Sequence, residues 1–410
     1  MTTRTAVFNF LDLNAFTQGT PYDALAELRR ESPVYWHPMP SKRIPDDGFW
    51  LVTTHQDIVS IEKRPEIFSS HCGLTIADPP PRSMGPATSM MLDGLTHLDP
   101  PEHTAHRQVI APMFTPRAVA ALEPAIRATA VEVIERALER GRIDFAIDVA
   151  LRFPVAMVIG RLMGFPESDF HRVIDWSDFV VAPDDPQYPS WTGVKIIQEM
   201  HDYGKAAIAA RRKEPRGDVL STLLATTGAE GQPMSDEMFL RYFWSLLTGA
   251  FDTTASVIAG GMHALVSFPA EFDKLRANPS LIAGAVEEML RWVTPTIYFR
   301  RTTMRETELR GQRIEKGQRV VMCYAAANRD EAVFKDPDVF DVARTRNDHL
   351  AFGHGQHFCL GSSLARAETR ILFEELIARG VRVELRGPIK RAHSNFQNRI
   401  KEMPVFIHAH

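Results

Sequence analysis

The longest helical pattern of the chain runs over residues 235–267. Ser235 is a residue type that caps helices, Asp236 suits a first turn, and Pro269 follows the end of the pattern. At about 1.5 Å per residue, a helix of this length spans roughly 50 Å. Residues 242–251 carry no charge, which predicts burial on all sides. We therefore expect one long central helix.

Shorter patterns divide the rest of the chain into helices and a few strands. Apolar runs at 34–36 and 49–53 flank a Pro/Asp/Gly turn at 45–48, which predicts a β-hairpin. The stretches 308–314 and 318–324 are typical of paired strands around glycine turns. Further expected elements are helices at 21–31, from 99, around 287–291 and from 360 to 379, and a final hairpin at 393–405.

The middle of the chain, 117–213, predicts several helices. The expected breaks are at Gly141, Pro154, 164–166 and 181–189. Residues 69–98 are rich in Pro, Gly, Ser and Met, and such a long irregular segment in a compact domain is usually a functional loop or disordered.

Composition indicates an ordinary globular protein, because 44% of its 410 residues are hydrophobic and 24% are charged. No long linker divides the chain, so we expect a single domain over 1–410, with about the first 20 residues as an N-terminal arm. A net charge of −4 gives no indication of nucleic-acid or anionic-membrane binding.

The sequence contains no apolar run long enough for a membrane span. Residues 1–16 lack the apolar core of a signal peptide. Cys72, Cys323 and Cys359 are too few and too scattered for a disulfide framework. We expect a cytoplasmic protein.

The most informative stretch is 352–361, Phe-Gly-His-Gly-Gln-His-Phe-Cys-Leu-Gly. Glycine allows the backbone to approach a flat ligand or to adopt positive φ. Cys359 precedes a predicted helix, whose N-terminal amides favour an anion, so we expect its thiol to ionise readily. A thiolate in such a loop is what a haem iron ligand requires.

Two other interpretations of this stretch remain open. The cysteine can be a buried core residue in a glycine turn, or His354, His357 and Cys359 can form a zinc site.

Two more motifs place charged residues where burial is expected. Asp252 and Thr253 interrupt the apolar middle of the long helix, where a carboxylate is costly without a role or a partner. The alternative is a local kink or cap. Glu288 and Arg291 are three apart on the next helix, where an exposed pair contributes only tenths of a kcal/mol.

Together these motifs resemble the cytochrome P-450 family, whose haem-binding signature Phe-Gly-x-Gly-x-His/Arg-x-Cys-x-Gly is filled at every fixed position. The resemblance runs through nearly the whole chain and is tightest from 235 onward. One departure is Gly249-Ala250, where the family usually has Ala-Gly; the methyl group narrows the dioxygen groove.

The resemblance implies a mainly α fold with small β-sheets in one triangular domain, and haem b (iron protoporphyrin IX) as the cofactor. It implies that Asp252 and Thr253 deliver protons, and that a buried Glu288–Arg291 pair fixes the loop before Cys359. The residues that it assigns to haem are Cys359 as the iron ligand, His103, Arg107, Arg301 and His357 at the propionates, and Phe352 and Gly353 in the ligand loop.

The implied reaction is hydroxylation of a small hydrophobic molecule (a terpenoid, steroid or alkyl-aromatic compound) with dioxygen. Because no flavin domain is present, electrons are expected from an iron–sulfur ferredoxin with its reductase, docked near Arg107, Arg366 and Arg370. The alternatives are a peroxide-driven peroxygenase, which would not need Asp252 and Thr253, and a non-catalytic haem sensor.

The resemblance places the substrate pocket between the roof segment 69–98 and the tip of the final hairpin, and 183–186 matches a loop at the entrance. The pocket should be mainly apolar. Its candidate residues are Ala250, Ile297 and Phe396, with Met90, Met91 and Leu95 from the roof.

Overall fold

Helices dominate the fold, as the apolar and amphipathic runs predict. The computed structural model describes residues 8–39, 48–79, 82–182, 185–186, 192–229 and 231–409. Its helices are α1 (Tyr22–Glu31), α2 (His55–Glu62), α3 (Pro86–Leu92), α4 (Glu102–Ile110), α5 (Pro116–Arg140), α6 (Arg152–Val155), α7 (Phe170–Val181), α8 (Thr192–Lys213), α9 (Val219–Ala225), α10 (Asp236–Gly249), α11 (Asp252–Ser267), α12 (Pro269–Ala277), α13 (Ile282–Val293), α14 (Tyr324–Ala327) and α15 (Ser362–Ala378).

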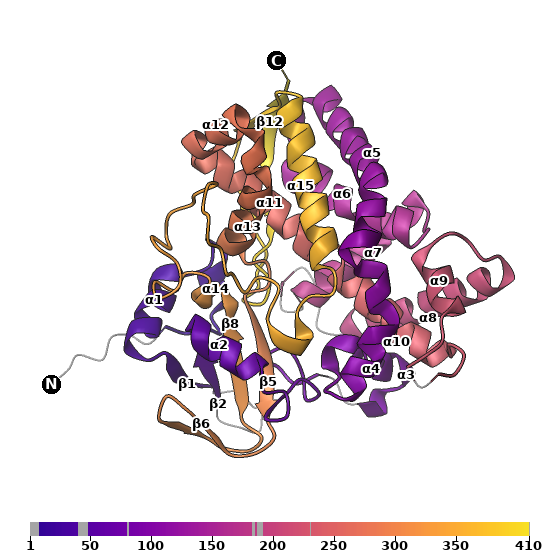
Figure 1. Cartoon of the computed structure of the whole chain (residues 1–410), viewed down its shortest axis with the longest axis vertical. Helices are drawn as coiled ribbons and strands as arrows, with labels where there is room; N and C mark the ends of the chain where they lie inside the picture. The colour runs from indigo at the N-terminus through magenta and orange to yellow at the C-terminus, as the bar shows by residue number, and fades with distance from the viewer. Residues whose placement is uncertain are drawn as a thin grey trace.

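The strands are short and gather mainly at one corner of a triangular body (Figure 1). They are β1 (Val34–Pro38), β2 (Gly48–Val52), β3 (Phe68–Ser69), β4 (Arg142–Asp144), β5 (Tyr298–Thr303), β6 (Thr307–Leu309), β7 (Gln312–Ile314), β8 (Arg319–Cys323), β9 (Arg382–Leu385), β10 (Lys390–Arg391), β11 (Ile400–Glu402) and β12 (Pro404–His408).

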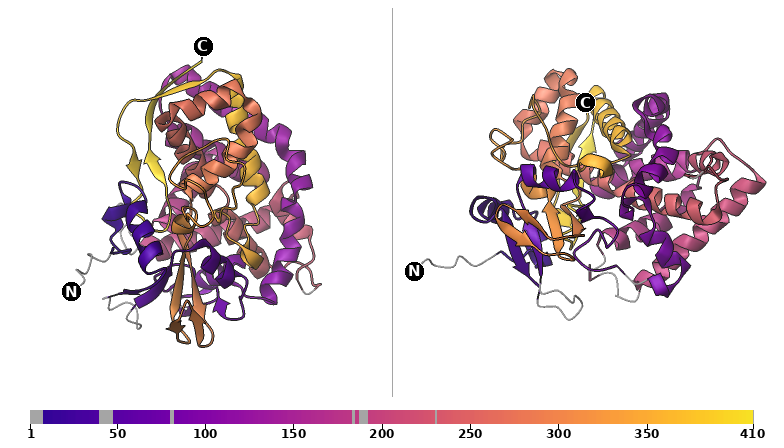
Figure 2. Two further views of the ribbon diagram at one scale, coloured as in Figure 1. Left: turned by 60° about the vertical axis from the view of Figure 1, so that its left-hand side comes forward. Right: turned by 60° about the horizontal axis from the view of Figure 1, so that its bottom comes forward.

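The largest sheet joins strands from distant parts of the sequence in the order β1-β2-β8-β5-β3. The predicted first hairpin is confirmed, since β1 and β2 pair antiparallel; residues 45–47 of its turn lie outside the described residues. β2 then pairs in parallel with β8, with Trp50 opposite Val320. Figure 2 shows the N-terminal strands and β5 and β8 at the same corner from two further directions.

The stretches 308–314 and 318–324 do not pair with each other. The first folds back on itself as the β6–β7 hairpin, with Gly311 at a φ of 77° in the turn. The second forms β8 in the large sheet. Each of its residues is buried, which an outer hairpin strand would not be. The final hairpin, predicted at 393–405, is present as β10–β11, but its first strand lies before that range.

The expectation of one helix over 235–267 is wrong. Ser235 does cap a helix, and its hydroxyl accepts from the Met238 amide, but α10 ends at Gly249. Phe251 leaves the helical conformation, with φ −127° and ψ −35°, and α11 begins at Asp252. Glycine weakens the helix at this point, and Asp is a residue type that competes for backbone partners. The two helices therefore meet at the predicted proton-delivery residues.

Two further expectations need correction. Pro154 does not break the middle region, because it lies inside α6, which π-helical turns at Ala146–Leu151 and Ala156–Leu162 continue on both sides. The segment 69–98 is not wholly irregular, because α3 forms within it. The predicted break at 164–166 is present between these turns and α7, and α5 ends before Gly141.

The largest hydrophobic cluster lies among α5, α11, α13 and α15, which run side by side in Figure 1. α13 carries the predicted buried ion pair. Arg291 donates to Glu288 at 2.7 and 2.8 Å, and both side chains are 0% exposed. Arg291 also donates to the carbonyls of Asn328, Pro337 and Val339. The pair therefore anchors the chain that leads to Cys359, as expected.

Candidate functional site

Backbone contacts on both sides hold the loop that carries Cys359. The Cys359 amide donates to the Phe352 carbonyl at 2.9 Å. Gly353 and Gly355 have φ values of 67° and 65°, in the left-handed region that glycine adopts without strain. A Cβ on Gly355 would overlap the carbonyl oxygen of Glu62, at the end of α2. Both glycines are thus required by the turn, and one also by its packing on α2.

The Cys359 thiol lies just before α15, as predicted, but its electrostatics differ from the expectation. Burial raises its pKa, and this outweighs the opposing effects of the Gly361 and Ser362 amides and of Arg107 and Arg366. The prediction of a readily ionised thiol is therefore wrong for the chain alone, because desolvation of the anion dominates. A coordinated metal cation deprotonates such a thiol.

The four residues predicted at the propionates come together beside this loop. The rings of His103 and His357 lie 4.1 Å apart, centre to centre. Arg107 donates through Nη2 to the carbonyl of Phe358 at 2.7 Å. Arg301, from β5, is close enough to lower the pKa of both histidines. Residues from α4, β5 and the ligand loop thus converge on one place.

The positive charge of this cluster comes from its two arginines, because both histidines resist protonation. Burial lowers the pKa of His103 to about 4, with Arg107 as the next cause, and the pKa of His357 falls well below its ordinary value. The buried Nδ1 of His103 has no hydrogen-bond partner among the described residues. Arg301 lies 4.0 Å from Glu62. Two guanidinium groups and two imidazoles therefore fit the two carboxylates of a haem.

The zinc alternative finds no support here. Within the part of the chain that the structure describes, no three His, Cys, Asp or Glu side chains are arranged to hold a metal ion. A haem iron, in contrast, needs only one protein ligand of this kind.

Asp252 is buried at the start of α11, beside Thr253. Its side chain is 1% exposed, and burial raises its pKa. The Oδ1 atom lies 2.9 Å from Nη1 of Arg399, although the geometry is not that of a hydrogen bond. The Thr253 hydroxyl lies 3.5 Å from the Gly249 carbonyl. A carboxyl next to a weakly engaged hydroxyl can hold and pass a proton.

Arg399 connects this pair to α7, the helix that precedes the predicted entrance loop. Its guanidinium pairs with Asp252 and also with Asp178 on α7. Nearby, Lys401 pairs with Asp185 at 3.1 Å. Of the predicted entrance loop, 183–186, residues 183–184 lie outside the described residues.

Two charged residues of the site were not predicted from the sequence: the basic Arg399 and the acidic Glu62. Arg399 follows the polar tip of the final hairpin, where nothing distinguishes it from a solvated residue. Glu62 gives a weak sequence signal, because it lies at the end of a helix that also carries Ile58 and Ile61. In the structure Glu62 is only 7% exposed. An acidic residue on an apolar face can indicate a buried role.

The candidate substrate residues fall into two groups. Ile297 and Phe396 come together, because the Ile297 amide donates to the Phe396 carbonyl at 2.8 Å. Ala250 lies at the break between α10 and α11. Met90 and Leu95 are buried in the largest cluster, with Met91 packed against it. A substrate cavity lined by both groups stays a prediction.

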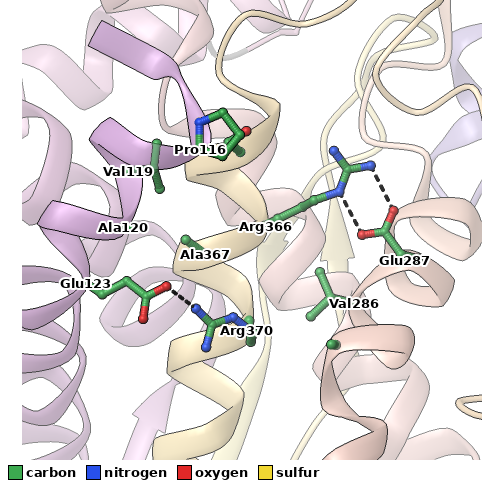
Figure 3. A pocket seen from close by; sticks show the side chains of 11 residues that line it. Pro116, Val119, Ala120, Glu123, Val286, Glu287, Arg366, Ala367 and Arg370 are labelled. Carbon is green, nitrogen blue, oxygen red and sulfur yellow. Dashed lines mark hydrogen bonds and ion pairs between the residues drawn. The ribbon is translucent and has the colours of Figure 1, made fainter.

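A groove of about 310 Å³ lies between α5, α13 and α15, on the side of the fold where α15 leaves the Cys359 loop. Figure 3 shows that an ion pair flanks each side of it, Arg366 with Glu287 and Arg370 with Glu123. The predicted basic docking face is therefore largely neutralised at Arg366 and Arg370. The floor of the groove is apolar and is made by Pro116, Val119, Ala120, Ala283, Val286 and Ala367.

Comparison with known proteins extends over almost the whole chain. Residues 187–380 match the family model described as Cytochrome P450. Linalool 8-monooxygenase of Pseudomonas putida is 35% identical over 96% of this chain and 97% of that protein. Steroid C26-monooxygenase of Rhodococcus jostii (strain RHA1) is 34% identical over 97% of this chain and 84% of that protein.

Solved structures agree with this. A Mycobacterium marinum cytochrome P450 in complex with pseudoionone has a TM-score of 0.87 and 32% identity, and the match covers 99% of each chain. A Bacillus megaterium cytochrome P450 in complex with testosterone has a TM-score of 0.83 and 29% identity, covering 94% of this chain and 97% of that one.

Proposed function

Since this chain belongs to the cytochrome P450 family of monooxygenases, we propose that it binds haem b through Cys359 and hydroxylates a small terpenoid, steroid or alkyl-aromatic compound. The observation that carries the proposal is the convergence of the Cys359 loop with the cluster of His103, Arg107, Arg301 and His357. Bound haem supplies dioxygen activation, in which one oxygen atom enters a C–H bond and the other leaves as water.

In this proposal the chain holds and orients its cofactor. Arg107 and Arg301 would pair with the propionates, and His103 and His357 would donate to them. Phe352 and Gly353 would shape the loop that carries Cys359. The Glu288–Arg291 pair would keep the preceding chain in place.

Asp252 and Thr253 would manage the protons that the reaction consumes. The raised pKa of Asp252 lets its carboxyl hold a proton nearer to neutral pH, where general acids work best. Thr253 would pass it on through its hydroxyl. This role favours the dioxygen reaction over a peroxide-driven one, which needs no such relay.

The substrate class rests on the relatives and on apolar residues. Linalool 8-monooxygenase is named for a terpenoid and Steroid C26-monooxygenase for a steroid. Ile297, Phe396 and Ala250 would contribute an apolar wall. A screen of terpenoids, steroids and alkyl-aromatic compounds for the low-to-high-spin Soret shift of the purified protein tests this class. If no compound of these kinds shifts the band, the substrate proposal is wrong.

Electrons would come from a ferredoxin with its reductase. We also propose a cytoplasmic location, supported by three cysteines that are all unpaired.

Replacement of the ligand tests the central assignment. Cys359→His keeps an iron ligand but removes thiolate donation, so the red-shifted Soret band of the ferrous carbonyl form should disappear and hydroxylation should stop. The matched control is Cys323→Ser, because Cys323 is buried in β8, away from the loop. A Cys359→His protein that keeps the band would contradict the ligand assignment.

A further inference from the structure

Glu62 is a buried carboxylate in the cofactor site that none of the roles above uses. It ends α2, and its side chain is 2% exposed. The Oε1 atom of Glu62 lies 3.3 Å from the position that a Cβ would take on Gly353. The backbone carbonyl of Glu62 fills the space where a Cβ on Gly355 would lie. The carboxyl therefore packs directly on the Cys359 loop without contacting the cysteine.

The hydrogen bonds of Glu62 leave half of its carboxyl unsatisfied. Tyr324 of α14 donates its hydroxyl to Oε1 at 2.7 Å, and the His354 backbone donates from the loop. Oε2 is buried and has no partner among the described residues. Arg301 Nη2 is 4.0 Å from Oε1, beyond hydrogen-bond distance. A buried carboxylate with an unused oxygen attracts the nearest guanidinium.

The charged and titratable groups that face Glu62 are Arg301 from β5 and Tyr324 from α14, and the loop contributes the backbone of His354. Its chain neighbour Lys63 is exposed. Burial raises the pKa of Glu62 to about 7, against the lowering effects of Arg301, Tyr324 and His354. Both protonation states of this carboxyl are therefore accessible near neutral pH.

We propose that Glu62 is a positioning residue that competes with the haem propionate for the Arg301 guanidinium, and that its protonation accompanies haem reduction. This rests on the proposed haem site. An ionised Glu62 draws Arg301 toward itself and weakens its hold on the propionate. A protonated Glu62 releases Arg301 to the propionate.

Charge balance gives the direction of this coupling. Reduction adds one electron from the electron-donor protein to the ferric site. Glu62 then takes one proton from water and changes from carboxylate to carboxylic acid, so the net charge of the site is unchanged. A carboxylate beside the site disfavours the added electron. The reduction potential should therefore fall as pH rises through the range in which Glu62 titrates. At pH values well below that range the potential should be constant.

The test is a spectroelectrochemical titration of the holoenzyme from about pH 5 to about pH 9, a range that brackets this titration. The wild-type protein should show the fall. Glu62→Gln should remove it and keep the potential of the acid limit throughout, whereas Glu62→Asp should restore a pH dependence. The matched control is Glu66→Gln, an exposed glutamate just after α2, which should behave as the wild type.

A second variant tests the idea without touching the carboxyl. Tyr324→Phe removes the hydroxyl that stabilises ionised Glu62, so the fall should move to higher pH while keeping its size. An unshifted fall in Tyr324→Phe, or an unchanged one in Glu62→Gln, overturns the proposal. Loss of the thiolate-type carbonyl band in the wild type would instead refute the haem site itself.

Discussion

Single side chains at the break between α10 and α11 should separate oxygen activation from substrate binding. Asp252 and Thr253 are polar, so we expect neither to supply the apolar contacts that hold a substrate. Each can therefore be changed with little effect on substrate affinity.

Thr253→Ala should uncouple electron use from product formation. The hydroxyl would be lost and water would take its place, so more of the consumed reductant should end as hydrogen peroxide. Asp252→Asn should slow turnover instead, on the order of a hundredfold, because an amide is a poor proton relay. The measurement is cofactor oxidised against product and peroxide formed, with Thr254→Ser as the control. Wild-type coupling in Thr253→Ala would move the proton role elsewhere.

A second buried acid, Glu368 on α15, should make stability depend on pH. Both carboxyl oxygens lack partners among the described residues, and burial raises its pKa well above the ordinary value. A group whose pKa is raised on folding stabilises the protein below its unfolded pKa, and this contribution is lost as pH rises.

Glu368→Gln should therefore raise the melting temperature, and the gain should grow from about pH 5 to about pH 8, since the wild-type protein must keep this acid neutral. Thermal unfolding of the holoenzyme at several pH values measures it. Glu374→Gln is the control, because Glu374 is paired with Arg127 and Arg370. A gain that does not vary with pH would mean that Glu368 is ionised and paired in solution.

At the level of the element, helix ends were predicted better than helix interiors. Ser235 and Pro269 mark real ends because capping and the missing proline amide are local effects. The break at Phe251 and the passage of the helix through Pro154 depend on what packs around them. A single sequence does not contain those neighbours.

The Ser235 cap predicts a measurable change. Ser235→Ala removes the acceptor for the Met238 amide and should lower the free energy of unfolding by about 1 kcal/mol, whereas Ser235→Asp should keep most of it. Chemical denaturation of the holoenzyme is the measurement. Product formation should be unchanged, because the cap lies a full helix away from Asp252. Equal stability of Ser235→Ala and the wild type would show that the cap is replaced by water.

The candidate site shows the same division between local pattern and long-range packing. The Cys359 loop, both arginines and both histidines of the cluster were implied by the resemblance to the cytochrome P-450 family. Arg399 and Glu62 reach the site from the ends of other elements, where ordinary spacing carries no signal. The thiol was misjudged because burial, which only the fold determines, outweighs the helix terminus.

At the level of the whole molecule, the ion pairs beside the groove in Figure 3 bear on the expected docking of an electron donor. Arg370 is held by Glu123 and Glu374, so it contributes little net charge. Removing one partner should expose it.

Glu123→Gln should therefore speed reduction by an acidic ferredoxin at low salt, and the advantage should vanish at high ionic strength, because salt screens such attraction. Stopped-flow reduction at a series of salt concentrations measures it. Glu139→Gln makes the same charge change near the far end of α5 and is the control. Equal rates for both variants at low salt would place the docking surface elsewhere.

The parallel pairing of β2 with β8 also has a consequence for biosynthesis. Trp50 must wait for Val320 before this ladder can form. At about 5–20 residues per second, a ribosome needs roughly 15 to 55 s to make the intervening chain. During that time the β1–β2 hairpin has an open edge, and two strands alone are marginally stable. Nascent chains of this protein should therefore depend on chaperones until β8 has left the exit tunnel.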